Sequence, residues 1–144
     1  MAGYGWPIDL AAAARAEVVG LHEFFVGWFT GVLDDDGRVF ERLTGVLHRE
    51  FSMIVPSGAL LTRDGVIASV RSAHATAEGS FAIEIRDVAD HVVGQDIVLV
   101  TYEEWQYVGE RVVDRRVSTA VFVPAGGTVH GVQWRHLHET FRST

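Results

Sequence analysis

The order of segments along the chain constrains its fold more than any other feature. Helix-forming sequence occupies the first part of the 144 residues, and long stretches of alternating apolar and polar residues fill the second half. Apolar side chains recur at helical spacing over residues 10–33, with Asp9 as the expected N-cap. Shorter helices are expected over residues 39–47 and from the cap Thr62 to about Ala75.

Five strands are expected where β-branched and aromatic residues alternate with polar ones. They cover residues 51–55, 81–92, 96–108, 112–123 and 129–141. Short turns separate the last four strands, so these pair antiparallel, and parallel pairing is expected only where the first strand joins. The pattern predicts an α+β fold. A cone-shaped, strongly curved, mostly antiparallel sheet wraps around three N-terminal helices and encloses a cavity.

Composition limits the partners that such a domain can have. Hydrophobic residues make up 48% of the chain and charged residues 22%, which indicates one folded domain over residues 1–144 with an arm at residues 1–8. The net charge of −7 repels polyanions, so no nucleic-acid partner is expected. No apolar stretch approaches the roughly 20 residues that span a bilayer, so no membrane partner is expected either. The lack of cysteine and of a signal peptide predicts a cytoplasmic protein.

Four stretches resemble the nuclear transport factor 2-like superfamily, in particular its SnoaL-like, or ketosteroid-isomerase-like, domains of unknown function. They are residues 21–25, 51–58, 116–122 and 134–140, the last of which is similar to a His-x-His-x-Ser/Thr ending. The resemblance implies a cystatin-like cone and a central cavity for a small, largely apolar molecule. It also implies that no cofactor is bound, and that any chemistry is acid–base chemistry of the isomerase, cyclase or dehydratase type.

The chain departs from the steroid isomerases at their catalytic positions. Those enzymes place an aspartate just before a Pro-x-Gly turn, and here Val55 precedes residues 56–58. They also use a tyrosine on the first helix, where this chain has side chains without a hydroxyl: Phe24, Phe25, Trp28 and Phe29. We therefore expect no turnover of steroid enones, because both the general base and the oxyanion donor are lost.

Comparison with superfamily members also indicates which residues of the strands face the cavity. It points Tyr102 and Glu104 inward, and it points Arg135, Leu137 and Glu139 inward on the last strand with His136 and His138 outward. On the predicted strand 112–123, the residues expected to face inward are Val117, Thr119, Val121 and Val123. The expected ligand-binding residues are Trp28, Phe29, Met53, Val100, Tyr102, Glu104, Thr119, Leu137 and Glu139. For the aromatic residues among them, ordinary core packing is the alternative.

Two carboxylates at the edge of one cavity raise the possibility of acid–base chemistry. Glu104 and Glu139 in a poorly hydrated site would push one pKa upward, and His48 near the cavity mouth is a further candidate. The alternative is that each glutamate pairs with an arginine such as Arg115 or Arg135, and that His48 interacts with a helix C-terminus.

The histidines near the C-terminus are candidate metal ligands. His136 and His138 lie two apart on a strand and share a face, and His130 has the same parity if no bulge intervenes. No spacing fixes a third ligand, so surface or interface histidines are the preferred interpretation and no metal is expected.

The leading functional prediction is a domain that binds a small molecule. The alternatives are a non-catalytic oligomerisation or ligand-sensing module, or the structural small subunit of a ring-hydroxylating dioxygenase. A homodimer is expected through the outer face of the sheet, which would expose the apolar side chains Trp105, Tyr107, Phe122 and Trp134.

Overall fold

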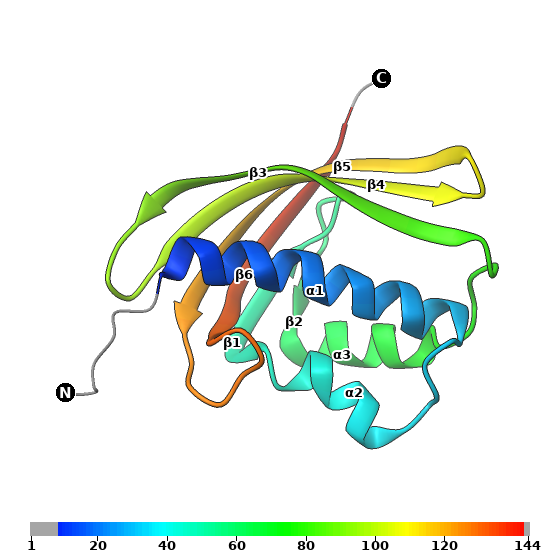
Figure 1. The fold of residues 1–144 in the computed structure, drawn as a ribbon, viewed down its shortest axis with the longest axis horizontal. Helices are drawn as coiled ribbons and strands as arrows, with labels where there is room; N and C mark the ends of the chain where they lie inside the picture. The colour runs from blue at the N-terminus through cyan, green and yellow to red at the C-terminus, as the bar shows by residue number, and fades with distance from the viewer. Residues whose placement is uncertain (1–8, 143–144) are drawn as a thin grey trace.

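Helices and a single curved sheet pack as two layers in the computed structural model, which describes residues 9–142 (Figure 1). The helices are α1 (Leu10–Thr30), α2 (Gly37–Thr44) and α3 (Arg63–Ser72). The strands are β1 (Leu47–Ile54), β2 (Leu60–Thr62), β3 (Phe81–Val93), β4 (Val98–Val108), β5 (Arg111–Pro124) and β6 (Val132–Phe141). The long helix α1 crosses the concave side of the sheet, with α2 and α3 beside it (Figure 1). The predicted α+β fold class is confirmed.

The sheet is mixed, with the strand order β2-β1-β6-β5-β4-β3. All neighbouring strands are antiparallel except β1 and β6, which run parallel. The single parallel pairing therefore occurs where the first strand joins, as predicted. Parallel strands need a long connection, and here most of the chain lies between them.

Local signals set the beginnings of the helices. The Asp9 side chain accepts a hydrogen bond from the Ala12 N–H, and the Thr62 hydroxyl accepts one from the Gly65 N–H, so both predicted N-caps are present. Helix α1 ends at Thr30 and not at Leu33, because Gly31 adopts the left-handed conformation with φ 78° and its N–H bonds to the Trp28 carbonyl.

The segment after α2 differs from the prediction. The helix ends at Thr44, so His48 lies in strand β1 and not at a helix C-terminus. Strand β1 begins early because it pairs with β6: the Trp134 N–H donates to the Val46 carbonyl, and Leu47 lies opposite Trp134. The short strand β2, where no strand was predicted, pairs with β1.

The inward-facing residues of β5 were predicted wrongly. Ser118, Ala120 and Phe122 are fully buried, whereas the set predicted to face inward is only partly buried: Val117, Thr119, Val121 and Val123. Directly opposite residues of paired strands share a face. Tyr102 lies opposite Ser118, so the inward residues of β4 require the even-numbered residues of β5 to face inward.

A bulge changes the orientation of residues at the start of β6. The register between β5 and β6 shifts between Val121 and Phe122, so one extra residue, Arg135, stands between His136 and Trp134. Trp134 and Leu137 are therefore both buried, and Arg135 is not inward as predicted but donates to the Glu50 carbonyl.

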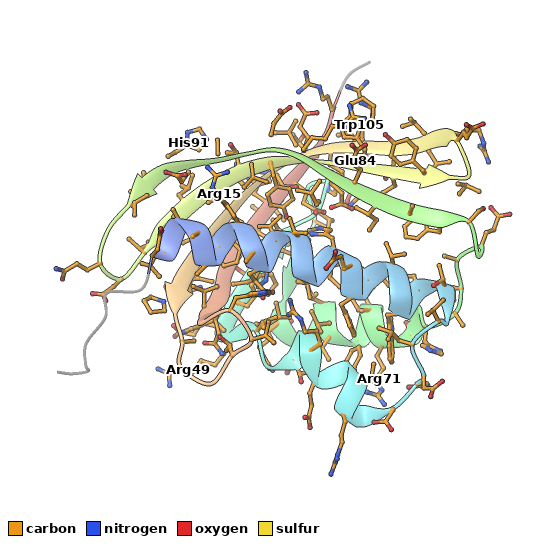
Figure 2. All side chains as sticks on the ribbon, viewed as in Figure 1. Arg15, Arg49, Arg71, Glu84, His91 and Trp105 are labelled. Atoms are coloured by element: carbon orange, nitrogen blue, oxygen red, sulfur yellow. The ribbon has the colours of Figure 1, made fainter. Side chains whose placement is uncertain are left out.

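The predicted outer patch loses half of its members through these two changes. Phe122 and Trp134 lie in the core, with ring centroids 4.5 Å apart. Trp105 does lie on the outer face, away from α1, where Figure 2 shows it close to Glu84. The guanidinium groups of Arg86 and Arg115 lie 3.7 Å and 3.9 Å from its ring centroid.

A buried carboxylate ties α1 to the rest of the molecule. Glu17 has no exposed surface, and it accepts hydrogen bonds from Arg42 of α2 to both of its oxygens, at 3.1 and 3.0 Å. The Trp134 indole N–H donates to it at 2.9 Å, and His130 Nδ1 lies 3.0 Å from it. We call Glu17, Arg42, His130 and Trp134 the Glu17 cluster.

Two further expectations concern the N-terminal arm and membrane-spanning helices. The predicted arm at residues 1–8 lies outside the described residues. Within residues 9–142, no helix combines the length and the apolar character that crossing a bilayer requires.

Candidate functional site

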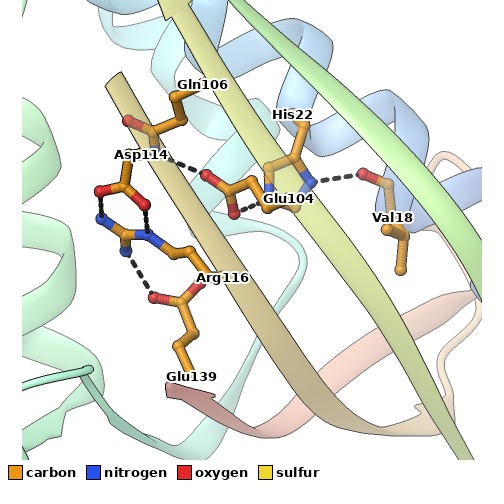
Figure 3. Close-up of polar contacts among 7 residues, drawn as sticks. All are labelled: Val18, His22, Glu104, Gln106, Asp114, Arg116 and Glu139. Atoms are coloured by element: carbon orange, nitrogen blue, oxygen red, sulfur yellow. Dashed lines mark hydrogen bonds and ion pairs between the residues drawn. The ribbon is translucent and has the colours of Figure 1, made fainter. Parts of the chain in front are cut away.

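A cavity of about 280 Å³ lies between the helices and the concave face of the sheet. Residues four apart on α1 give it one wall, since Leu21, Phe25 and Phe29 fall on one side of the helix. The other apolar lining residues come from α2, α3 and the sheet: Leu43, Leu47, Phe51, Met53, Val66, Val70, Ile83, Trp134 and Leu137. The polar lining residues are His22, Glu104, Gln106, Arg116 and Glu139, which we call the polar end of the cavity (Figure 3).

His22 and Glu104 form a buried pair at the polar end. His22 Nδ1 lies 2.7 Å from the Val18 carbonyl, which can only accept, so Nδ1 bears a proton and donates. Nε2 lies 3.0 Å from Glu104 Oε1, and this contact requires a second proton between the two groups. Burial lowers the pKa of His22, but the Glu104 carboxylate and the two hydrogen bonds outweigh burial and raise it overall.

The pKa of Glu104 moves in the opposite direction, as an ion pair requires. Burial raises the pKa of Glu104, but His22, Gln106 and Arg116 lower it to about 2. Gln106 Nε2 donates to Glu104 Oε2 at 2.7 Å, so both carboxylate oxygens have donors. Both shifts favour the ion-paired form, in which an imidazolium lies beside a carboxylate.

Arg116 joins two carboxylates on the far side of the polar end. Its Nε and Nη2 donate to the two oxygens of Asp114 at 2.9 and 2.8 Å, and Nη1 donates to Glu139 Oε1 at 2.8 Å (Figure 3). All three guanidinium nitrogens thus contact carboxylates. This fork geometry fixes the position of Glu139 at the cavity wall.

Glu139 is the least satisfied ionisable group of the polar end. The residue is only 6% exposed, and within residues 9–142 its second oxygen, Oε2, accepts no hydrogen bond. Burial raises the pKa of Glu139, the negative charge of Glu104 raises it further, and Arg116 offsets only part of this. The carboxyl group of Glu139 therefore takes up a proton more readily than that of an exposed glutamate.

Two hydroxyl groups lie buried next to Glu139. Tyr102, Ser118 and Glu139 stand in one row across β4, β5 and β6. The hydroxyl oxygens of Tyr102 and Ser118 have no hydrogen-bond partner within the described part of the chain. Burial raises the pKa of Tyr102 well above its ordinary value, and Glu139 and Glu104 raise it further.

The structure divides the residues predicted to bind a ligand into three groups. Those that line the cavity are Phe29, Met53, Glu104, Leu137 and Glu139. Trp28, Val100 and Tyr102 are fully buried behind the lining. Thr119 was predicted wrongly, since it lies on the outer face of β5 opposite Thr101 and His138.

The remaining predicted residues lie apart from the cavity. His48 Nδ1 accepts a hydrogen bond from the Glu50 N–H and is not part of the lining. His136 contacts Ser52, His130 belongs to the Glu17 cluster, and His138 is exposed. Within residues 9–142, no three His, Asp or Glu side chains are grouped to hold a metal ion.

Sequence reasoning missed His22, Gln106 and Arg116. A signal for His22 was present, because Val18, His22 and Phe25 fall on the apolar face of α1 at helical spacing. Arg116 was hidden by the wrong assignment of the inward side of β5, since it shares a face with Ser118.

Comparison with known proteins places the chain in a family. Residues 14–143 match the sequence profile of the family described as sucrose-6-phosphate phosphohydrolase C-terminal. Sucrose-phosphatase 2 and sucrose-phosphatase 1 of Nicotiana tabacum are each 28% identical to the chain over 129 residues. That alignment covers 87% of this chain and 30% of each relative, so the chain spans less than a third of their length.

Solved structures agree on the fold. A nuclear transport factor 2-like protein of unknown function from Pseudomonas aeruginosa is 28% identical, with a TM-score of 0.79 over 91% of this chain and 99% of that one. A protein with a cystatin-like fold from Caulobacter vibrioides has a TM-score of 0.65 at 14% identity, over 92% of this chain and 89% of that one. A protein from Thiobacillus denitrificans, provisionally assigned as a calcium/calmodulin-dependent protein kinase type II association domain, has a TM-score of 0.62 at 19% identity, over 97% and 99%.

These matches confirm the superfamily that the four sequence stretches predicted, and the profile match covers nearly all described residues. The chain belongs to the sucrose-6-phosphate phosphohydrolase C-terminal family and has the fold of the nuclear transport factor 2-like superfamily.

Proposed function

We propose that this domain binds a small molecule with an apolar body and one polar end. The observation that supports this most is the arrangement of the cavity, in which twelve apolar side chains lead to one buried carboxyl group with an unpartnered oxygen. A volume of about 280 Å³ lies just below the roughly 300–1,000 Å³ typical of ligand pockets. The expected ligand is therefore smaller than a typical drug molecule.

The polar end disfavours a carboxylate ligand. Glu104 and Glu139 are both acidic, and like charges repel strongly in a poorly hydrated site. The three guanidinium nitrogens of Arg116 already contact Asp114 and Glu139, so this cation is committed to protein carboxylates. Neutral or cationic polar groups should bind better than their carboxylate analogues.

A sugar phosphate is the ligand that the names of the tobacco relatives suggest. The cavity gives it little support, because a phosphate ester needs uncommitted cations or backbone N–H groups and a sugar needs many polar partners. The walls instead carry phenylalanine, leucine and valine side chains. The matched region is also only 30% of those enzymes, so we do not carry their activity over to this chain.

Acid–base chemistry on the bound molecule is the finer form of this proposal. Glu139 has the burial and the free oxygen that a proton-transferring carboxyl group requires, and Arg116 holds it in place. The assignment to the SnoaL-like branch and the isomerase, cyclase or dehydratase type of reaction stay predictions.

An association module is the second candidate function. Two solved structures of this fold are provisionally assigned as association domains, and the outer face of the sheet carries Trp105 and Tyr107 together with valines. We propose a homodimer through this face, with Val117, Val121 and Val123 in place of Phe122 and Trp134. Multi-angle light scattering tests this, and a monomeric mass at micromolar concentration would rule it out.

The binding proposal is tested by filling the cavity. Val70 lines it, so Val70→Phe should remove space without adding charge, whereas Val32→Phe makes the same change at a side chain that is 81% exposed. Small aromatic amides and alcohols should raise the melting temperature of the wild type and of Val32→Phe, and should lose this effect in Val70→Phe. Equal shifts in both variants would show that these molecules bind elsewhere.

A further inference from the structure

Two side chains that line the polar end each have a hydrogen-bond acceptor without a donor within residues 9–142. The first is Glu139 Oε2, since only Oε1 is held by Arg116. The second is Gln106 Oε1: the amide nitrogen must face Glu104, because a carboxylate cannot accept from a carbonyl oxygen, and this places the carbonyl on the other side. Both residues line the cavity, so a ligand that satisfies them must donate hydrogen bonds.

The polar end also has one carboxyl group more than it has cations. Every charged group there is accounted for: His22 from α1, Glu104 from β4, Arg116 and Asp114 from β5, and Glu139 from β6. His22 is matched by Glu104, and Arg116 is matched by Asp114 in a bidentate pair. Glu139 then has only a shared contact with Arg116, so its ionised form leaves a net charge of about −1 in a buried site, which is costly.

We propose that the polar end of the cavity binds the protonated amine of a ligand, with Glu139 Oε2 and Gln106 Oε1 as its hydrogen-bond acceptors. An ammonium group has three donors and no acceptor, so it matches two acceptors and supplies the missing positive charge. The aromatic lining residues Phe25 and Phe29 stack on each other in the cavity wall, where they can contact the apolar body of such a ligand, and aromatic rings tolerate a nearby cation well. The ligand class is a small primary amine with an apolar, ring-sized body.

This inference rests on the proposed small-molecule function and adds a proton linkage to it. In the empty protein, burial and Glu104 favour the protonated form of Glu139. An ammonium group favours the carboxylate, so binding at a pH between the two pKa values of Glu139 should release a proton. A neutral alcohol of the same shape does not require Glu139 to be ionised, so its binding should release no proton.

The experiment compares four compounds with one apolar body: phenethylamine, phenethyl alcohol, phenylacetamide and phenylacetate. The wild type should bind the amine about tenfold more tightly than the alcohol, since hydrogen bonds to charged groups are the stronger ones. Phenylacetate should bind most weakly. Isothermal titration calorimetry in two buffers of different ionisation enthalpy measures both the affinities and the protons released.

The variant Glu139→Gln removes the charge and keeps an acceptor for Arg116, so it should abolish the preference for the amine and the proton release, and should weaken alcohol binding much less than amine binding. The control Glu103→Gln makes the same change on the outer face of β4, where the carboxylate contacts Arg142 and Trp105. This variant should keep both the preference for the amine and the proton release. If Glu139→Gln does not fold, the calorimetry of the wild type decides alone.

The possible outcomes separate this inference from the proposed function. Alcohol or amide binding as tight as amine binding, without proton release, would overturn the ammonium site and leave the cavity as a ligand site. Binding of none of the four compounds would overturn both. Equal loss of amine preference in Glu139→Gln and Glu103→Gln would show that the charge acts from a distance and not by contact.

Discussion

Glu17 and Glu139 are both buried glutamates of this domain, and they differ in how completely the protein satisfies them. Glu17 has no exposed surface and is surrounded by Arg42, His130 and the Trp134 indole, which reach both of its oxygens. Glu139 is nearly as buried, but within residues 9–142 Arg116 alone donates to it, and to one oxygen.

The difference in hydrogen bonding matches a structural role for Glu17 and the ligand-binding role that we propose for Glu139. A buried charge surrounded by donors joins the elements that supply them, here α1, α2 and the segment around β6. A buried charge with a free oxygen next to a cavity costs stability and is kept where it can meet a ligand. Hydrogen-bond saturation, more than burial, therefore separates the two roles.

Replacing each glutamate by glutamine should give the largest difference between the two regions. Glu17→Gln turns a donor group toward Arg42 and His130 and breaks a buried ion pair, so it should lower the free energy of unfolding by about 3–5 kcal/mol. Glu139→Gln keeps the Arg116 hydrogen bond and should lower it by less than about 1 kcal/mol. Urea unfolding measures both. Equal losses would show that Glu139 has a structural role like that of Glu17.

The pair of His22 and Glu104 gives the next largest effect, and it depends on pH. The pKa of Glu104 is lowered from 4.5 to about 2, so its stabilisation is present above pH 4.5 and is lost as the pH falls toward 2. The pKa of His22 is raised above 6.5, so its stabilisation is complete below pH 6.5 and is lost as the pH rises through the folded-state value. The pair therefore stabilises most between pH 4.5 and 6.5.

The variant His22→Gln keeps a donor toward Glu104 but cannot titrate. It should lower the free energy of unfolding by roughly 2 kcal/mol near pH 6, the scale of one hydrogen bond to a charged group, and by less as the pH rises. Unfolding in urea at a series of pH values measures the difference from the wild type. A difference that stays constant from pH 6 to pH 9 would mean that His22 is not protonated in the folded protein.

The sequence predicted features that depend on neighbouring residues, but not the contacts between residues far apart in the chain. The caps Asp9 and Thr62 act within three residues, so they were predictable. Glu104 and Glu139 were expected to face inward, and both line the cavity. The contact of His22 with Glu104 joins residues 82 apart, and no local pattern encodes such a pairing.

Two physical features made β5 and β6 harder to predict. On β5 the β-branched valines occupy the outer face, while the inner face carries Ser118 and Ala120, so hydrophobicity alone favours the wrong side. On β6 the bulge at Arg135 changes the orientation of every residue before it, and a bulge depends on how neighbouring strands meet. Trp134 was therefore assigned to the surface, although it is a member of the Glu17 cluster.

A smaller effect is expected at Gly20, which lies against two side chains of the Glu17 cluster. A Cβ atom there would lie 2.9 Å from His130 Cε1 and 3.0 Å from Arg42 Nη2, and Glu17 holds both of these side chains. Gly20→Ala should lower the free energy of unfolding by about 1 kcal/mol, despite a gain in helix propensity of similar size.

A double-mutant cycle with Glu17→Gln tests this explanation. Once Glu17 no longer holds Arg42 and His130, both side chains can move, and Gly20→Ala should become neutral or stabilising. The coupling is measured from urea unfolding of the two single variants and the double variant. Strict additivity would mean that the close contacts at Gly20 act through the backbone and not through the cluster.

The smallest effect is expected at Glu103, a partly buried glutamate whose ion-pair partner is exposed to water. It is the chain neighbour of Glu104 but faces the outer side of β4, where it pairs with Arg142, whose side chain is 44% exposed. Exposed ion pairs contribute roughly 0–1 kcal/mol and are screened by salt, so Glu103→Gln should cost about 0.5 kcal/mol, and less in about 1 M sodium chloride. The loss in Glu17→Gln should hardly change with salt, because that pair is shielded from ions. Urea unfolding at low and high salt measures the losses in both variants. A similar salt dependence in Glu17→Gln and Glu103→Gln would mean that solvent reaches Glu17. Hydrogen-bond saturation would then no longer distinguish Glu17 from Glu139.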